Sequence, residues 1–285
     1  MSFKAAAVQM CSGADPVKNA AAMARLVREA AAQGATYVQT PEMTGMLQRD
    51  RTAARAVLAD EAHDIIVKTG SELARELGIH MHVGSTAIAL ADGKIANRGF
   101  LFSPDGKILN RYDKIHMFDV DLDNGESWRE SAAYTAGSEA RVLSLPFAEM
   151  GFAICYDVRF PALFRAQAVA GAEVMTVPAA FTKQTGEAHW EILLRARAIE
   201  NGVFVIAAAQ AGRHEDGRET FGHSMIIDPW GTVLASAGAT GEAVIVAEID
   251  PSAVKAAHDK IPNLRNGRDF SVEKIAGAIA GGVAA

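Results

Sequence analysis

The stretch Gly-Phe-Ala-Ile-Cys-Tyr-Asp-Val-Arg-Phe-Pro at residues 151–161 joins an apolar run to a proline that can open a helix. The run 151–154 predicts a buried strand, and the pattern from Pro161 to Ala170, closed by Gly171, predicts a helix. Cys155 therefore stands at a strand-to-helix turn. Such turns lift a nucleophile off the sheet and leave backbone N–H groups for an oxyanion. The alternative is a buried cysteine that serves only as a small apolar side chain.

Strand and helix patterns alternate along the rest of the chain, which is typical of a layered α/β domain. We predict strands at residues 4–9, 37–40, 80–86, 99–102, 151–154, 173–177, 203–209, 223–227 and 243–249. We predict helices at residues 16–32, 64–77, 161–170 and 190–200. The turn residues 103–106, Ser-Pro-Asp-Gly, indicate a hairpin, and residues 118–137 have no clear period and indicate a loop. We expect one domain over residues 1–285.

Composition narrows the kinds of partner. The chain has 28 basic and 34 acidic residues in a scattered pattern, which gives no basic surface for a nucleic acid. Its apolar runs are too short to span a bilayer, and its first residues lack the features of a signal peptide, so we expect no membrane partner and a cytoplasmic location. Two cysteines, Cys11 and Cys155, argue against a disulfide framework. A small molecule is the expected partner.

Two further segments place charged side chains after predicted strands. The strand at residues 37–40 stops at Pro41 and is followed by Glu42, a carboxylate that can act as a general base. Lys114 begins the polar stretch and is flanked by large apolar side chains. Each residue alone would be interpreted as a solvated surface residue.

Together these residues resemble the three motifs of the nitrilase superfamily of carbon-nitrogen hydrolases. Pro41-Glu42, the segment Tyr-Asp-Lys-Ile-His at 112–116 and the segment 154–161 match the order and spacing of that family. The similarity continues through residues 178–182, 185–190, 195–201, 208–210 and 222–231. These later segments most resemble the branch of the deaminated-glutathione amidases and the omega-amidases. Ala162 departs from that branch, which more often carries glutamate there.

The resemblance implies a four-layer αββα sandwich, a homodimer, and a catalytic set made of Cys155, Glu42 and Lys114. It also implies a second glutamate after the lysine. The polar stretch offers Glu126 and Glu130 for this role, and Glu130 fits the family pattern better.

The same resemblance suggests how the reaction and the substrate would be held. Lys114 and the N–H of Tyr156 would bind the oxyanion, and Phe181 and Thr182 would lie beside the substrate. Ionising a thiol of pKa about 8.5 at neutral pH costs about 2 kcal/mol. An ammonium at about 4 Å supplies about 4 kcal/mol at an effective dielectric near 20, so we expect Lys114 to favour the thiolate. Arg159 is the candidate contact for a substrate carboxylate, or else it pairs with an acidic structural partner.

We therefore expect a cysteine amidase that hydrolyses a small carboxylate-bearing primary amide to acid and ammonia through a thioester, without metal or organic cofactor. Deaminated glutathione and the omega-amide of a keto acid are the candidate substrates. The alternatives on the same scaffold are an N-carbamoyl-amino-acid hydrolase, a nitrilase and a non-catalytic interaction protein. Nitrilases tend to show Trp-Glu after the cysteine, where this chain has Tyr156-Asp157. A metal hydrolase built on His80 and His82 is a further alternative.

Overall fold

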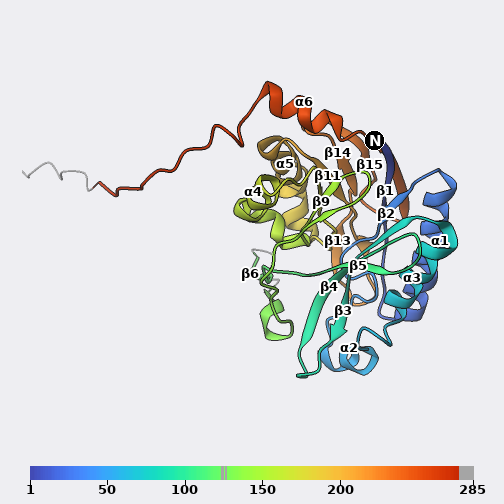
Figure 1. Ribbon diagram of the computed structural model, residues 1–285. Helices are drawn as coiled ribbons and strands as arrows, with labels where there is room; N and C mark the ends of the chain where they lie inside the picture. The colour runs from blue at the N-terminus through green and yellow to red at the C-terminus, as the bar shows by residue number, and fades with distance from the viewer. Residues whose placement is uncertain (123–124, 126, 276–285) are drawn as a thin grey trace, which may run out of the picture.

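Two six-stranded sheets lie face to face in the computed structural model, which describes residues 1–122, 125 and 127–275 (Figure 1). The first sheet has the order β16 (Ala243–Ile249), β1 (Phe3–Gln9), β2 (Tyr37–Gln39), β3 (His80–Ala89), β4 (Ile95–Phe102) and β5 (Ile108–Asp113). The second has the order β15 (Val233–Ser236), β14 (Met225–Ile227), β11 (Phe204–Ala207), β10 (Val174–Thr176), β9 (Glu149–Phe152) and β8 (Val142–Ser144).

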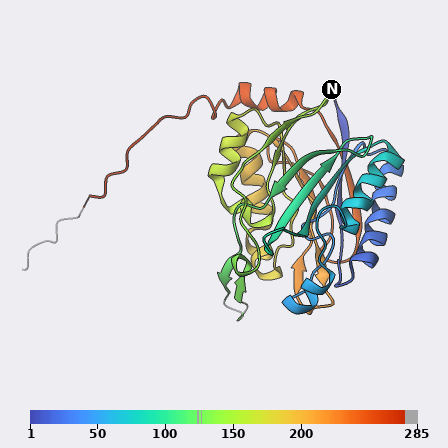
Figure 2. The ribbon, with the colours of Figure 1, turned by 60° about the horizontal axis from the view of Figure 1, so that its bottom comes forward.

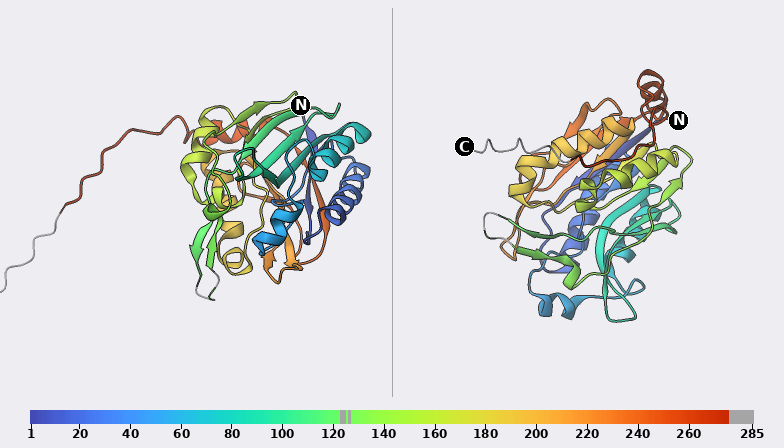
Figure 3. Two further views of the ribbon diagram at one scale, coloured as in Figure 1. Left: turned by 90° about the horizontal axis from the view of Figure 1, so that it is seen from below. Right: turned by 90° about the vertical axis from the view of Figure 1, so that its left-hand side faces the viewer.

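Helices cover the outer face of each sheet (Figures 2 and 3). The helices α1 (Pro16–Ala32) and α3 (Ile65–Leu77) pack on the first sheet, and α4 (Pro161–Val169) and α5 (Lys183–Asn201) pack on the second. The order of layers is thus helix, sheet, sheet, helix, which confirms the expected αββα sandwich.

Strand β1 shows how the sequence produces two apolar layers. Its residues alternate between the faces of the sheet, as the two-residue period of a strand requires. Ala5 and Ala7 belong to the core between the sheets, whereas Ala6 and Val8 belong to the core beneath α1 and α3. A strand buried on both faces reads as a continuous apolar run, which is why this segment was recognisable in the sequence.

Close backbone approach positions the end of β2. A Cβ added to Gly84 of β3 would lie 2.1 Å from the carbonyl oxygen of Thr40 and 2.4 Å from the Cβ of Pro178. Only glycine fits there, because such contacts are far inside van der Waals distance. The end of β2, which carries Glu42, is thereby held against the loop that follows β10.

Most predicted elements are present with boundaries shifted by a few residues, but two expectations were wrong. Residues 118–137 are not all loop: they include the hairpin of β6 (Asp119–Asp121) and β7 (Ser127–Arg129) and the short 3-10 helix η1 (Glu130–Ala132). Helix α5 begins at Lys183 rather than at 190, because Gly186 lets the helix pack directly against Phe221. Sequence patterns also missed α2 (Arg51–Val57), α6 (Ser252–Lys260), β12 (Ala211–Arg213) and β13 (Glu219–Phe221).

Two further features concern the surface. The exposed chain of residues 267–275 extends away from the layers (Figure 1). A search of the described residues finds no helix with the length and apolar character needed to cross a bilayer.

Candidate active site

Cys155 lies three residues after the end of β9, at the first residue of the 3-10 helix η2 (Cys155–Arg159). Its φ of 50° places it in the left-handed region, which a residue with a Cβ rarely adopts. The turn is held by hydrogen bonds: the Cys155 N–H donates to the carbonyl of Pro178 at 2.9 Å, and the Asp157 carboxylate accepts from the Ile154 N–H at 2.9 Å. Strained backbone of this kind is typical of functional sites.

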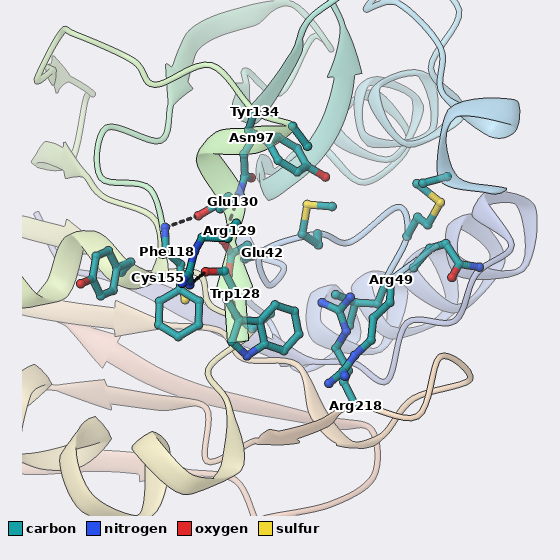
Figure 4. Close-up of a pocket in the computed structure, with 18 of the residues that line it drawn as sticks. Glu42, Arg49, Asn97, Phe118, Trp128, Arg129, Glu130, Tyr134, Cys155 and Arg218 are labelled. Carbon is teal, nitrogen blue, oxygen red and sulfur yellow. Dashed lines mark hydrogen bonds between the residues drawn. The ribbon is translucent and has the colours of Figure 1, made fainter. Parts of the chain in front are cut away.

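Two carboxylates and one ammonium gather next to this thiol. Lys114 Nζ lies 2.9 Å from Glu42 Oε1 and 2.8 Å from Glu130 Oε2. Glu42 lies beside Cys155, close enough for its negative charge to act on the thiol. The four side chains come from the ends of β2, β5 and β9 and from η1, and Cys155, Glu42 and Lys114 are all at least 93% buried. The structure thus brings together the residues predicted from three separate motifs (Figure 4). Glu126, the other candidate for the second glutamate, lies outside the described residues.

The carboxylates are held by donors that the sequence analysis missed. The Asn97 side chain donates to Glu42 Oε1 at 2.9 Å and to Glu130 Oε1 at 3.2 Å. The backbone N–H of Ala180 donates to Glu42 Oε2 at 2.8 Å, and that of Phe118 to Glu130 Oε2 at 2.7 Å. Asn97 is 1% exposed within β4, so an asparagine in a strand that is apolar apart from its neighbour Arg98 was the signal available in the sequence.

Burial and charge set the protonation state of this cluster. Burial opposes ionisation of Glu42, but the Lys114 ammonium and the hydrogen bonds to the carboxylate hold its pKa below the ordinary value. Burial likewise disfavours the charged form of Lys114, but the Glu130 and Glu42 carboxylates outweigh it and raise the lysine pKa well above its usual range. Glu42 is therefore ionised and Lys114 protonated at neutral pH.

Lys114 favours the thiolate form of Cys155, as expected, but other influences on the thiol are larger. Burial, followed by the negative charge of Glu42, raises the pKa of the Cys155 thiol well above its ordinary value, although Lys114 acts in the opposite direction. The physical reason is that one ammonium faces two carboxylates, so the cluster already carries net negative charge and a thiolate would add to it. These effects favour a neutral Cys155 thiol beside the Glu42 carboxylate.

A cavity of about 370 Å³ opens onto these residues, within the range of small-molecule sites (Figure 4). Cys155, Tyr156, Phe181 and Thr182 all line it, as expected for residues beside a substrate. No hydrogen bond joins the Tyr156 N–H to another described residue, so this donor is free to receive an oxyanion.

Arg159 does not line this cavity. Its guanidinium lies 5.1 Å from the centre of the Phe181 ring and 5.8 Å from that of Tyr156, and Nη1 is 3.3 Å from His189 Nδ1. A role for Arg159 in binding a carboxylate stays a prediction. The arginines that do line the cavity were not singled out in the sequence.

The histidines considered for metal binding have other partners. His82 is buried between the sheets, where its Nδ1 lies 2.7 Å from the Tyr37 hydroxyl, and burial lowers its pKa to about 3. Within the described residues, no three histidine, cysteine, aspartate or glutamate side chains are grouped to hold a metal ion.

An αββα sandwich with a buried thiol, a carboxylate and an ammonium at its strand ends is the arrangement of a cysteine-dependent hydrolase. The carbon-nitrogen hydrolase family matches residues 4–259, and the chain belongs to this family. The expected enzyme class, an amidase, is confirmed by this match and by the relatives.

Three relatives show the extent of the similarity. The chain is 39% identical over 271 residues to the deaminated glutathione amidase of Yersinia enterocolitica, with 93% of each protein covered. The solved structure of the NitFhit protein of C. elegans superimposes on this chain with a TM-score of 0.86 at 33% identity. The match covers 94% of this chain and 65% of NitFhit, so this chain spans just under two thirds of that protein. The amidase of Nesterenkonia sp. AN1 matches at 25% identity with a TM-score of 0.76, covering 91% of this chain and 98% of that one. It was solved as a glutamate-to-glutamine mutant with acrylamide added to its active-site cysteine.

Proposed function

We propose that this protein hydrolyses a small carboxylate-bearing amide through a thioester on Cys155. The observation that carries the proposal is the buried cluster of Glu42, Lys114 and Glu130, with the Cys155 thiol beside Glu42 in the same cavity. A base, an oxyanion donor and a nucleophile are thus in contact without any further group.

The first half of the reaction forms the thioester. The Cys155 sulfur attacks the amide carbonyl while its proton passes to the Glu42 carboxylate, so that no free thiolate accumulates. The carbonyl oxygen becomes an oxyanion held by the Lys114 ammonium and the Tyr156 N–H. The C–N bond then breaks as Glu42 returns the proton to the leaving nitrogen. Ammonia departs from a primary amide, and an amine departs from a substituted amide.

The second half regenerates the enzyme. Glu42 takes a proton from water, the resulting hydroxide equivalent attacks the thioester carbonyl, and the C–S bond breaks to release the acid and the thiol. Glu130 acts through Lys114: its carboxylate orients the ammonium at 2.8 Å and helps to keep it protonated.

The names of the relatives support the substrate class. Several curated relatives that are 38–40% identical are deaminated glutathione amidases. We infer that deaminated glutathione, or a related omega-amide of a keto acid, is the substrate. An N-carbamoyl amino acid or a nitrile would be the better substrate if this inference were wrong.

A substrate panel with two cysteine variants tests this proposal. Release of amine or ammonia is measured from deaminated glutathione, α-ketoglutaramate, a neutral amide and an N-carbamoyl amino acid. We expect Cys155→Ala to abolish turnover and Cys11→Ala, which alters the exposed cysteine, to retain it. A tenth or more of wild-type activity in Cys155→Ala would show that catalysis is not covalent at this residue.

We further propose that residues 1–285 form one domain, that the protein is cytoplasmic and that it forms a homodimer. Apolar side chains exposed on the outer side of the second sheet support the dimer: Ile192 and Ile199 on α5 are 70% and 49% exposed, and Trp230 is 56% exposed. Ile199 packs beside Gly231, so it and Trp230 belong to one surface. A contiguous apolar surface of this kind is typical of an interface.

A further inference from the structure

Positive charge lines the cavity away from the catalytic cluster. Five arginines contribute to its wall, Arg49, Arg51, Arg55, Arg129 and Arg218. Lys114 pairs with Glu42 and Glu130, and Glu219 is the one further acidic residue among the lining residues that the structure describes. Outside the wall, Asp121 pairs with Arg129 and Asp216 with Arg218, so the five arginines still outnumber these three acidic residues. The part of the cavity beyond the cluster therefore attracts anions.

Arg218 has the geometry of a carboxylate-binding residue. It lies in the turn between β12 and β13, and its side chain is only 16% exposed. Its Nε donates to the nearly inaccessible carboxylate of Asp216 at 2.7 Å, and no other described residue accepts a hydrogen bond from its two terminal nitrogens. A fixed guanidinium with both terminal nitrogens available can bind a carboxylate through two parallel hydrogen bonds.

Arg49 brings a second guanidinium to the same place. Its guanidinium carbon lies 4.7 Å from the centre of the Trp128 ring, and that of Arg218 lies 5.0 Å from it. Burial lowers the pKa of Arg218, and the positive charge of Arg49 lowers it further, so the two cations repel one another. Figure 4 shows both arginine side chains beside Trp128, with Cys155 on the other side of the indole in this view.

Tyr134 connects this place to the catalytic cluster. Burial raises the pKa of its phenol to about 12, and the charges of Glu130 and Arg218 act on it in opposite directions, so the phenol is near both. Its ring lines the same cavity. A single extended molecule can therefore contact the cluster and the arginines at once.

We propose that Arg218 and Arg49, gathered around Trp128, bind a carboxylate that the substrate carries several bonds away from the amide being cleaved. This assignment rests on the proposed amidase function and makes it specific: the substrate is an acid whose carboxylate and scissile amide lie at opposite ends. It places recognition on loops that line the cavity rather than on Arg159, which lies behind Phe181.

The test compares deaminated glutathione with its two monomethyl esters, one at the glycine carboxylate and one at the keto-acid carboxylate, by release of cysteinylglycine or its ester. We expect one of the esters to lose about tenfold or more in kcat/KM with the wild-type enzyme, because a buried guanidinium loses a charge-assisted hydrogen bond. In Arg218→Gln and in Arg49→Gln, this preference for the acid should shrink several-fold, mainly through KM for the acid.

Two control variants distinguish a specific contact of Arg218 and Arg49 with the carboxylate from a general effect of positive charge in the cavity. Arg213→Gln removes an exposed arginine from the same hairpin, outside the cavity, and should leave activity and preference unchanged. Arg55→Gln removes a lining charge that does not lie over Trp128 and should change the preference less than Arg218→Gln. Arg218→Gln also removes the ion pair with Asp216 and could unfold the protein, which a melting curve would reveal. Arg49 is exposed, so Arg49→Gln would still test the proposal in that case.

The outcomes are distinct for the two proposals. Equal rates on the acid and both esters, or an acid preference that survives in both arginine variants, would overturn the assignment of Arg218 and Arg49 while hydrolysis at Cys155 stands. A preference lost instead in Arg159→Gln would assign the contact to that residue. Turnover retained in Cys155→Ala would overturn the amidase mechanism itself.

Discussion

Replacing Lys114 by methionine removes the ammonium that holds two carboxylates together and leaves most of the side-chain volume in place. The lysine is 2% exposed and contacts Glu42 and Glu130 at 2.9 and 2.8 Å. In Lys114→Met these carboxylates face each other without a counter-ion. Removing one partner of a buried ion pair costs about 3–5 kcal/mol, so we expect a loss of that size in the free energy of unfolding near neutral pH.

The direction of the pH dependence follows from the two pKa shifts. In the wild-type protein Glu42 has a lowered pKa, so its contribution is fully present above the unfolded value near pH 4.3 and is lost as the pH falls through the folded pKa. Lys114 has a raised pKa, so its contribution is fully present below about pH 10.4 and is lost as the pH rises through the folded pKa. In Lys114→Met only burial and the remaining hydrogen bonds act on Glu42. Burial dominates, the folded pKa of Glu42 rises above the unfolded value, and the variant loses stability as the pH rises.

Urea denaturation at pH 5 and pH 8 measures this effect. In the wild-type protein, this cluster should contribute nearly the same free energy of unfolding at both pH values. Lys114→Met should be clearly less stable at pH 8 than at pH 5. Lys107→Met is the control, because this lysine is 80% exposed and pairs only with an exposed aspartate. A loss below about 1 kcal/mol at pH 8, or a loss of equal size at both pH values, would refute the picture of two buried carboxylates held by one ammonium.

Four further results follow from the same geometry. Cys155→Ala should leave the circular dichroism spectrum and melting temperature near those of Cys11→Ala while turnover disappears, and an unfolded Cys155→Ala protein would contradict the assumption that the thiol adds little to stability. Glu42→Gln should abolish turnover yet speed alkylation of Cys155 by iodoacetamide at pH 7, because the Glu42 charge raises the thiol pKa; slower alkylation would contradict this. Asn97→Ala should cost about 1–3 kcal/mol by leaving two buried carboxylates short of a donor, as a urea titration would measure. Trp230→Glu should convert a dimer to a monomer in sedimentation velocity, and an unchanged sedimentation coefficient would move the interface elsewhere.

Strand and helix patterns predicted an α/β domain, whereas the αββα sandwich and the proposed catalytic residues came from the resemblance of three short motifs to a known family. A strand that ends at a cysteine, a glutamate after a proline and a lysine after a strand are each visible within about ten residues. The sequence analysis missed Asn97 because its role is to hydrogen-bond two carboxylates that are 55 and 33 residues away in the chain. The protonation state of Cys155 could not be predicted for the same reason. It depends on the charges that three distant segments bring together, and the spacing of residues in the sequence does not give these distances.

In this chain the residues proposed for catalysis and those proposed for substrate recognition lie on different kinds of structure, the first at strand ends and the second on loops. The side chains of Glu42, Lys114 and Cys155, which we propose to be catalytic, follow strands of the two sheets, and close backbone packing at Gly84 holds the segment that carries Glu42. Arg49, Trp128 and Arg218 lie outside both sheets, before α2, in the β6–β7 hairpin and between β12 and β13. Loops tolerate substitution better than strands whose groups are buried, so these positions can change without moving the thiol. If that is correct, Arg49→Gln should lose its preference for an acid and still be alkylated at Cys155 at the wild-type rate, whereas a parallel loss of both would mean that recognition and reactivity share one structural unit.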